Sequence, residues 1–459
     1  MRDLVLLGIL PFILYAIAKR PFIGLGMWIW TALFFPNAWV YGPASYIRYN
    51  LLFTGVTILS YLAMRKKAKF QPGMLGAIVL LFFAWTTIST ILTVAPPATS
   101  WDIWSRFAKV IVLFIFVQLV VEKKLHLDFF LWCVVLSVGW FGCLEALKFI
   151  ASGGGHKIEG FTGHVLGDRN ELSLAFVMTL PICYYLLGQY RGRSRLLTLG
   201  LLGTMCLLVV AVIGTQSRGG FIAMAGFGAY LFLKTKHKIP YLLVLGVLGF
   251  GLSMLVSEEW TSRMNSIDSA AADDSSFLGR LVSWKMSFML AVKHPFFGGG
   301  FKSLEYYPVW AELSREFFSY SWFYTGDALP RTDAGRAAHS IYFQVLSEQG
   351  FGGLLIFLIV LGGAFFKAGA IARKTKRLDG PEWIGNAATM LQLSIFAYAL
   401  GGAALSLAYF ELFYAIIALL IVLDLRILPA ALAAAPAVRE QPRPVRRMPL
   451  PVTKPGPIA

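Results

Sequence analysis

The sequence predicts an all-α polytopic membrane protein with twelve or thirteen transmembrane helices and one large, partly helical periplasmic loop. Its 459 residues are 57% hydrophobic and only 14% charged, with a mean hydropathy of +0.67. A soluble domain is about a quarter charged. Apolar runs recur along the whole chain, and basic residues gather in alternate joints between them. These observations exclude an ordinary soluble domain.

Apolar runs of nearly 20 residues can cross the roughly 30 Å hydrocarbon core of a bilayer as helices. The expected spans are 4–18, 21–40, 47–64, 73–94, 103–121, 127–150, 170–188, 196–214, 218–233, 239–256, 339–366, 386–405 and 408–425. The first two are short, and a hairpin or a partial span is an alternative to two full crossings. All four cysteines lie inside expected spans, which favours buried thiols over disulfides or a zinc site.

Positive charge marks one side of the membrane. The basic clusters lie in the joints 65–69, 123–124, 191–195, 234–238 and 367–377. These joints share a side if the spans alternate, and the positive-inside rule makes that side cytoplasmic. The net charge of +17 therefore indicates a topology and not a nucleic-acid partner. The joints that then face the periplasm, or its equivalent, are 41–46, 95–102, 151–169, 215–217, 257–338 and a turn near 406.

The chain divides into four parts on this topology. Residues 1–256 form an N-terminal transmembrane bundle, 257–338 the large periplasmic loop, and 339–428 the C-terminal transmembrane helices. Residues 429–459 are rich in Ala, Pro and Arg, and they predict a disordered basic cytoplasmic tail attracted to anionic membrane lipids.

The large loop is expected to be a working domain, because loops of this length are usually functional or disordered. Within 275–301, near-helical spacing predicts a helix with one apolar face. The residues of that face are Phe277, Leu281, Trp284, Phe288 and Met289. His294-Pro295 and the glycines 298–300 end this helix. The alternative is a loop that only caps the bundle.

Three expected spans begin on the periplasmic side with helix-capping residues. Asp168 precedes one, Thr215 or Ser217 precedes the second, and His339 with Ser340 opens the third. A helix N-terminus carries free N–H groups and the positive end of the helix dipole. Three such ends on one surface suit an anion.

Arginines add positive charge at these helix starts. Arg169, Arg218 and Arg336 flank them, and Arg280 reaches the same region from the loop helix. Guanidinium groups bind phosphate through paired hydrogen bonds, so this surface is expected to bind a diphosphate, with Asn170 as a further candidate ligand.

The same residues have structural alternatives. Asn170 can simply be a hydrogen-bonding residue at the start of a helix. The alternatives for the arginines are ion pairs of Arg169 with Asp168 or Glu171, pairing of Arg280 with Asp273 or Asp274, and contacts of Arg218 with lipid headgroups.

His339 is the candidate general base. It opens a long span directly after the loop, and basic neighbours would lower its pKa and keep the ring neutral. A neutral imidazole can accept a proton from a hydroxyl group. The alternative is a hydrogen-bonding core histidine. Glu348, nine residues further on, lies on another helix face, and we expect it to make a buried structural pairing with another span.

Four segments, in this order, resemble the O-antigen ligase and polymerase superfamily of bacterial envelopes. They are GDRNELSLAFVMTLP, TQSRGGFIAMAG, GRLVSWKMSFMLAVKHPFFGGGF and AHSIYFQVLSEQGFGGLLIFL. The resemblance covers about residues 160 to 370. The stretch RPFIGLGMWIWTALFFPNAWVYG resembles the branch of exosortase-associated O-glycosylation ligases.

The resemblance implies a GT-C-like glycosyltransferase architecture in the bacterial inner membrane. It also implies an inverting, metal-independent transfer at the periplasmic face, without a cofactor. The donor would be a glycan on undecaprenyl diphosphate, and the acceptor would be a sugar hydroxyl of lipid A–core. His339 would be the base, while Arg218 and Arg280 would be the catalytic arginines that bind the diphosphate.

Other activities remain open at this stage. A polysaccharide polymerase or a protein O-oligosaccharide ligase of the same superfamily would use similar residues on another acceptor. A lipid or polysaccharide transporter is a rival from a different class. Transporters place ionisable residues in the middle of several spans, whereas here such residues are few (Glu145 and Glu411) and the basic cluster lies at one surface.

Overall fold

The computed structural model describes residues 2–234, 238–239, 246 and 275–434. In this part of the chain the regular elements are helices, and Thr325 and Asp327 form an isolated β-bridge. The α-helices are α1 (Arg2–Lys19), α2 (Pro21–Leu33), α3 (Pro36–Trp39), α4 (Tyr49–Leu62), α5 (Gly73–Ile91), α6 (Pro97–Val120), α7 (Lys124–Val134), α8 (Trp140–Ala151), α9 (Arg169–Tyr190), α10 (Arg195–Gly214), α11 (Arg218–Lys234), α14 (Ser275–Lys293), α15 (Tyr307–Arg315), α16 (Ile341–Arg377), α17 (Glu382–Gly401), α18 (Glu411–Val422) and α19 (Leu428–Ala434). A π-helical turn at Val135–Gly139 continues α7 into α8, and another at Leu423–Ile427 joins α18 to α19.

The apolar runs form helices as predicted, which confirms a polytopic membrane protein. Among the described residues, eight helical stretches are long and apolar enough to cross a membrane. Three shorter apolar helices, α2, α4 and α11, accompany them. Of the thirteen expected spans, twelve coincide with helices, and the remaining one, 239–256, lies outside the described residues except for positions 239 and 246.

Several predicted boundaries are wrong; the span expected to end at 366, for example, continues as α16 to Arg377. The span expected at 21–40 ends at Leu33, and a separate one-turn helix begins at Pro36. Phe35 between them has φ −99 and ψ 84, because a proline disfavours helical backbone in the residue before it. At the other end of the chain, helix α19 continues to Ala434, past the predicted boundary at residue 428.

Helix α9 lies at the centre of the bundle. In its apolar window 78% of the residues are buried, compared with 28% in α10. Helix α10 is peripheral and exposes Leu196 and Leu199, as a lipid-facing helix does. Cys206 on α10 is exposed for the same reason, so the prediction of a buried thiol is wrong there, while Cys133 and Cys183 are buried.

The basic joints meet at one end of the bundle, which we call the basic end. Arg426 donates hydrogen bonds to the backbone carbonyls of Val121, at 3.0 Å, and Lys69, at 2.8 Å. Lys367 pairs with Asp424 at 2.6 Å. Three of the predicted cytoplasmic joints therefore share an end, as alternating spans require.

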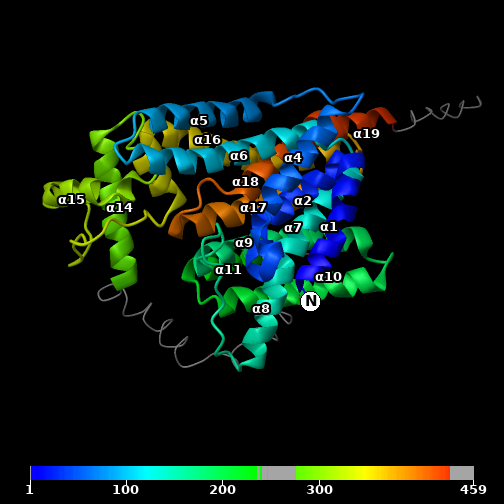
Figure 1. The fold of residues 1–459 in the computed structure, drawn as a ribbon, viewed down its shortest axis with the longest axis horizontal. Coiled ribbons are helices and arrows are strands. Elements are labelled where there is room, and N and C mark those ends of the chain that lie inside the picture. The colour runs from blue at the N-terminus through cyan, green and yellow to red at the C-terminus, as the bar shows by residue number, and fades with distance from the viewer. Residues whose placement is uncertain (1, 235–237, 240–245, 247–274, 435–459) are drawn as a thin grey trace, which may run out of the picture.

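The opposite end carries α14 and α15, and we call it the loop end (Figure 1). Helices α5, α6 and α16 run side by side toward it. Joints from distant parts of the chain meet there. The Val94 N–H donates to the Gly299 carbonyl at 2.9 Å, and the Ile158 N–H donates to the Gly214 carbonyl at 3.1 Å.

The loop helix forms as predicted, but its buried face is partly different. Its core contains Val282, Met286, Met289 and Leu290. Phe277, expected on this face, is 42% exposed. Trp284 stacks on Phe343 of α16 at 5.1 Å between ring centroids. The prediction of a single apolar face is wrong because α15 covers one side of α14 and α16 covers another.

Helix α16 is interrupted at Gly350, which has φ 71 and ψ −173. The glycines 298–300 insert at this break. The Gly299 N–H donates to the Ser347 carbonyl at 2.9 Å, and the Gly300 N–H donates to the Glu348 carbonyl at 3.0 Å. These bonds satisfy carbonyls that lose their helical partners at the break, as backbone groups inside a membrane protein require.

Candidate active site

Two of the predicted helix starts are tied together by side chains. Asp168 caps α9, since its carboxylate accepts hydrogen bonds from the backbone N–H of Asn170, at 2.8 Å, and from its side chain, at 2.7 Å. Ser217 caps α11, because its hydroxyl accepts from the Gly220 N–H at 3.2 Å. The same hydroxyl donates to Asn170 Oδ1 at 2.8 Å. Asn170 therefore links the starts of α9 and α11, which supports its structural alternative.

The glycines after Arg218 let α11 pack closely on its neighbours. A side chain on Gly220 would collide with Ser173 of α9, and one on Gly219 would lie 3.3 Å from Ala404. This packing holds the half-buried Arg218 beside the start of α9.

Arg280 and Arg336 lie together at the loop end. A Cβ atom built on Gly279 would be 2.5 Å from Arg336 Nη1, so this guanidinium covers the α14 backbone next to Arg280. Both arginines are half-buried. The structure thus brings together two of the predicted anion ligands from distant parts of the loop.

His339 occupies the turn that leads into α16. Its φ of 49 is left-handed, and its N–H donates to the Ser406 hydroxyl at 2.8 Å. Left-handed backbone costs a non-glycine residue roughly 1–2 kcal/mol, so the surrounding structure has to hold it. Such strained residues cluster at functional sites. Ser340 stands at the N-cap position of α16, but its side chain makes no capping hydrogen bond.

The surroundings of His339 lower its pKa. The ring keeps contact with solvent, but the protein around it removes water and so disfavours the imidazolium. The Arg280 guanidinium lowers the pKa further, and Arg336 acts in the same direction. The carboxylates of Asp168 and Glu305 oppose them without reversing the shift. The ring is therefore neutral at pH 7 and able to accept a proton.

Two charged residues that the sequence analysis did not single out belong to this cluster. Lys302 has φ 60, and its Nζ donates to Glu305 Oε1 at 2.6 Å. Its backbone N–H donates to Glu348 Oε1 at 3.1 Å. Burial opposes the ammonium charge, but the carboxylates of Glu305, Glu348 and Glu171 outweigh it and raise the pKa of Lys302. The run of three glycines at 298–300, just before Lys302, was the sequence signal, because glycines let the backbone of one segment approach another closely.

Glu348 makes a structural pairing, as predicted. It is buried, and its Oε2 accepts a hydrogen bond from the Tyr409 hydroxyl at 2.8 Å. Tyr409 belongs to the joint between α17 and α18, and not to another span as expected.

Arg169 begins α9 and points a nitrogen into the protein. Its Nη1 is buried and has no hydrogen-bond partner among the described residues. Such a group costs about 1–3 kcal/mol or more when left unpaired, and a bound anion would relieve this cost. The expected alternative partner Asp168 bonds Asn170 instead, and Asp273 and Asp274, the alternative partners of Arg280, lie outside the described residues.

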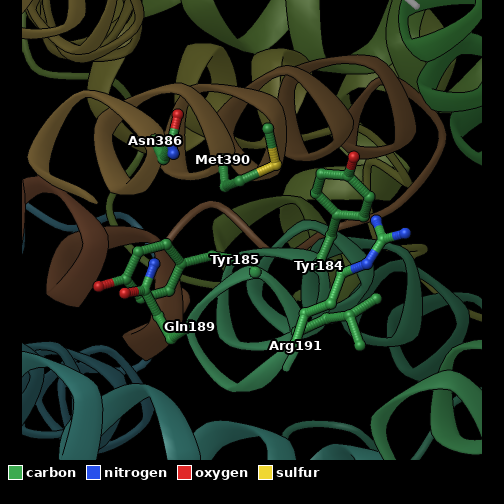
Figure 2. Close-up of a pocket in the computed structure, with 8 residues that line it drawn as sticks. Tyr184, Tyr185, Gln189, Arg191, Asn386 and Met390 are labelled. Carbon is green, nitrogen blue, oxygen red and sulfur yellow. The ribbon is translucent and has the colours of Figure 1, made fainter. Parts of the chain in front are cut away.

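Cavities lie at both ends of the bundle. One of about 250 Å³ lies at the basic end, where Tyr184 and Gln189 of α9 approach Asn386 and Met390 of α17 (Figure 2). Arg191, the residue after α9, also lines it. It is at the opposite end of α9 from Arg169. The second, of about 630 Å³, lies at the loop end. Among the described residues no group of three or more His, Cys, Asp or Glu is placed to hold a metal ion.

The fold defines a multi-pass membrane protein, and comparison with known families defines its class. Residues 203–358 match the family model described as O-Antigen ligase. This match identifies residues 203–358 as an O-antigen ligase domain and supports a multi-pass membrane enzyme of the ligase and polymerase superfamily. Residues 1–191 match a family of unknown function (DUF5935). No curated protein matches the chain.

The O-antigen ligase match contains Arg218, Arg280, Arg336 and His339, while Arg169 and Asn170 fall in the second match. Neither match names the exosortase-associated branch, which stays a prediction.

Proposed function

We propose that the chain transfers a glycan from undecaprenyl diphosphate to a sugar hydroxyl of lipid A–core, with inversion at the anomeric carbon. The observation that carries this proposal is the placement of His339, whose pKa is lowered by partial removal of water around its ring and by Arg280, within a segment that matches the O-antigen ligase family. The loop end faces the periplasm of a bacterial inner membrane in this proposal, because the basic joints gather at the other end.

The donor diphosphate binds at the loop end, between the starts of α9 and α11 and the Arg280–Arg336 pair. Arg218 and Arg280 are its principal ligands, and Arg169 and Arg336 add positive charge. Negative charge grows on the diphosphate as the anomeric C–O bond breaks, and fixed guanidinium groups stabilise it. Arginine supplies this neutralisation in place of a metal ion.

His339 acts as the general base. The acceptor hydroxyl attacks the anomeric carbon on the face opposite the diphosphate and passes its proton to the neutral imidazole. One glycosidic C–O bond forms, the bond to the diphosphate breaks, and undecaprenyl diphosphate leaves. General-base help of this kind is typically worth about 10² to 10⁴ in rate.

Acceptor identity tests the proposal. The purified chain in lipid nanodiscs is incubated with a lipid-linked glycan and one of three acceptors: lipid A–core, a second lipid-linked glycan, or a peptide with Ser and Thr. A mass gain on lipid A–core supports the ligase. A gain only on the lipid-linked glycan, or only on the peptide, replaces it with a polymerase or a protein O-oligosaccharide ligase. Lipid movement across vesicles with no new glycosidic bond indicates a transporter.

A further inference from the structure

The 630 Å³ cavity at the loop end has the size of a small-molecule binding site. Its walls come from α2, the segment from α3 to the start of α4, α6 and the joint before α9. All of these lie within residues 1–191, the part of the chain that matches a family of unknown function. Glu411, at the start of α18, completes the lining.

Three cations line this cavity: Arg48, Arg106 and Lys109. Arg106 pairs with Asp102 at 2.9 Å near the start of α6. Lys109 is exposed even though it lies near the middle of the apolar span Pro97–Val120. A charge inside a span costs roughly 2.5–3.5 kcal/mol on insertion scales, so it usually marks a functional position.

Polar groups without partners also face the cavity. Glu411 and Thr54 line the cavity. Glu411 Oε2 and Thr54 Oγ1 are buried and have no hydrogen-bond partner in the described part of the chain. The aromatic side chains of Trp28, Phe35 and Tyr49 stand beside them. Hydrogen-bonding groups next to aromatic faces suit sugar rings, and the cations suit a phosphate.

His164 adds no charge to the lining at neutral pH. Burial lowers its pKa to about 4, and its ring bonds the Ala32 carbonyl at 3.1 Å. The positive charge of the cavity therefore rests on the arginines and the lysine.

Two short segments connect this cavity to the candidate active site. His164 lines the cavity, and Asp168, four residues later, acts electrostatically on His339. Glu411 lines the cavity, and Ser406, five residues earlier, bonds the His339 backbone. Five residues extend at most roughly 18 Å. A short oligosaccharide spans such a distance.

We propose that this cavity binds the phosphate-bearing sugar head of the acceptor glycolipid and directs its terminal hydroxyl toward His339. This inference rests on the proposed function. The donor diphosphate has its own set of arginines on α11, α14 and the turn before α16, so the two substrates approach His339 from different sides of the loop end.

A binding measurement that needs no turnover tests this proposal. The full chain carrying His339→Asn is purified, and native mass spectrometry measures its binding of lipid A–core, of the same glycolipid without its phosphates, and of phosphatidylglycerol. The test variant adds Arg48→Gln and Lys109→Gln. The control adds Lys157→Gln, which removes an exposed cation of the same end that pairs with Glu159 at 2.6 Å outside the cavity.

The proposal expects the test variant to bind lipid A–core at least about tenfold more weakly, with the control unchanged. Removal of the phosphates from lipid A–core should weaken its binding to the parent chain to a similar extent. Unchanged binding of lipid A–core by the test variant would overturn the proposal. Binding of phosphatidylglycerol as tight as that of lipid A–core would also overturn it, because the cavity would then be a site for membrane lipid.

Two features keep the test decisive. Lys109→Gln alone repeats the measurement if the double change impairs folding, which thermal unfolding reports. Because binding is read without transfer, a failure of the proposed activity leaves this result readable.

Discussion

The backbone N–H of His339 donates a 2.8 Å hydrogen bond to the Ser406 hydroxyl. This bond joins the turn before α16 to the joint between α17 and α18, and it is made where His339 has a left-handed φ of 49. Because the bond holds the backbone, Ser406 sets the direction of the imidazole without using either ring nitrogen. We therefore treat Ser406 as a positioning residue.

Ser406→Ala should lower the turnover rate about fivefold, because a neutral hydrogen bond is worth about 1 kcal/mol. Ser406→Thr keeps the hydroxyl and should restore the rate. The KM for the donor should stay unchanged in both variants, since the diphosphate contacts other residues. An equal loss in Ser406→Thr, or a loss seen only in donor KM, would contradict this role.

The pH profile should move in opposite directions in two variants. Activity falls as pH drops through the pKa of His339, because the imidazolium cannot accept a proton. Arg336→Gln removes a positive charge that lowers this pKa, so the acidic limb of kcat/KM should shift to higher pH. Glu305→Gln removes a carboxylate that raises it, so the limb should shift to lower pH. Shifts in the same direction would show that another group controls the limb.

Arg280→Gln and Arg218→Gln should each weaken binding of undecaprenyl diphosphate about tenfold or more, because each removes a charge-assisted hydrogen bond. Arg315→Gln, at the exposed end of α15, is the matched control and should bind normally. Isothermal titration in nanodiscs measures the affinity. Normal binding by both test variants would show that these two arginines do not bind the donor diphosphate.

Gly298→Ala should destabilise the protein by more than about 1 kcal/mol, because a side chain disfavours its φ of 67 and would lie 2.5 Å from the Gly350 nitrogen. Gly203→Ala, on the peripheral helix α10, meets no atom within 4 Å and should be neutral or slightly stabilising. Thermal unfolding in detergent compares the two. Equal stability would mean that the glycine loop does not hold the break in α16.

Local signals explain what the sequence predicted well. The Asp168 cap, the Ser217 cap and the helix over 275–293 depend on neighbouring residues, so their patterns are visible in one stretch of chain. The spans follow from hydropathy in the same way. The separation of the basic end from the loop end follows from the clusters of Lys and Arg in alternate joints, which can be read directly from the sequence.

The features that the sequence did not predict depend on tertiary contacts. The break at Gly350 was not predicted, because it depends on insertion of the distant glycines 298–300. Lys302 and Glu305 reach the cluster only through that insertion. Lys109 lies inside the expected span 103–121, and its place in a cavity depends on how α4 and α18 pack around it.

The central claim is that His339 takes the proton of the acceptor hydroxyl. His339→Asn tests it most directly, because asparagine tolerates left-handed backbone but is not a base. The measurement is the transfer of labelled glycan to lipid A–core by purified enzyme with saturating donor. The account predicts a loss of about 10²-fold or more in rate, with thermal unfolding and donor binding unchanged. Transfer at the wild-type rate would contradict it.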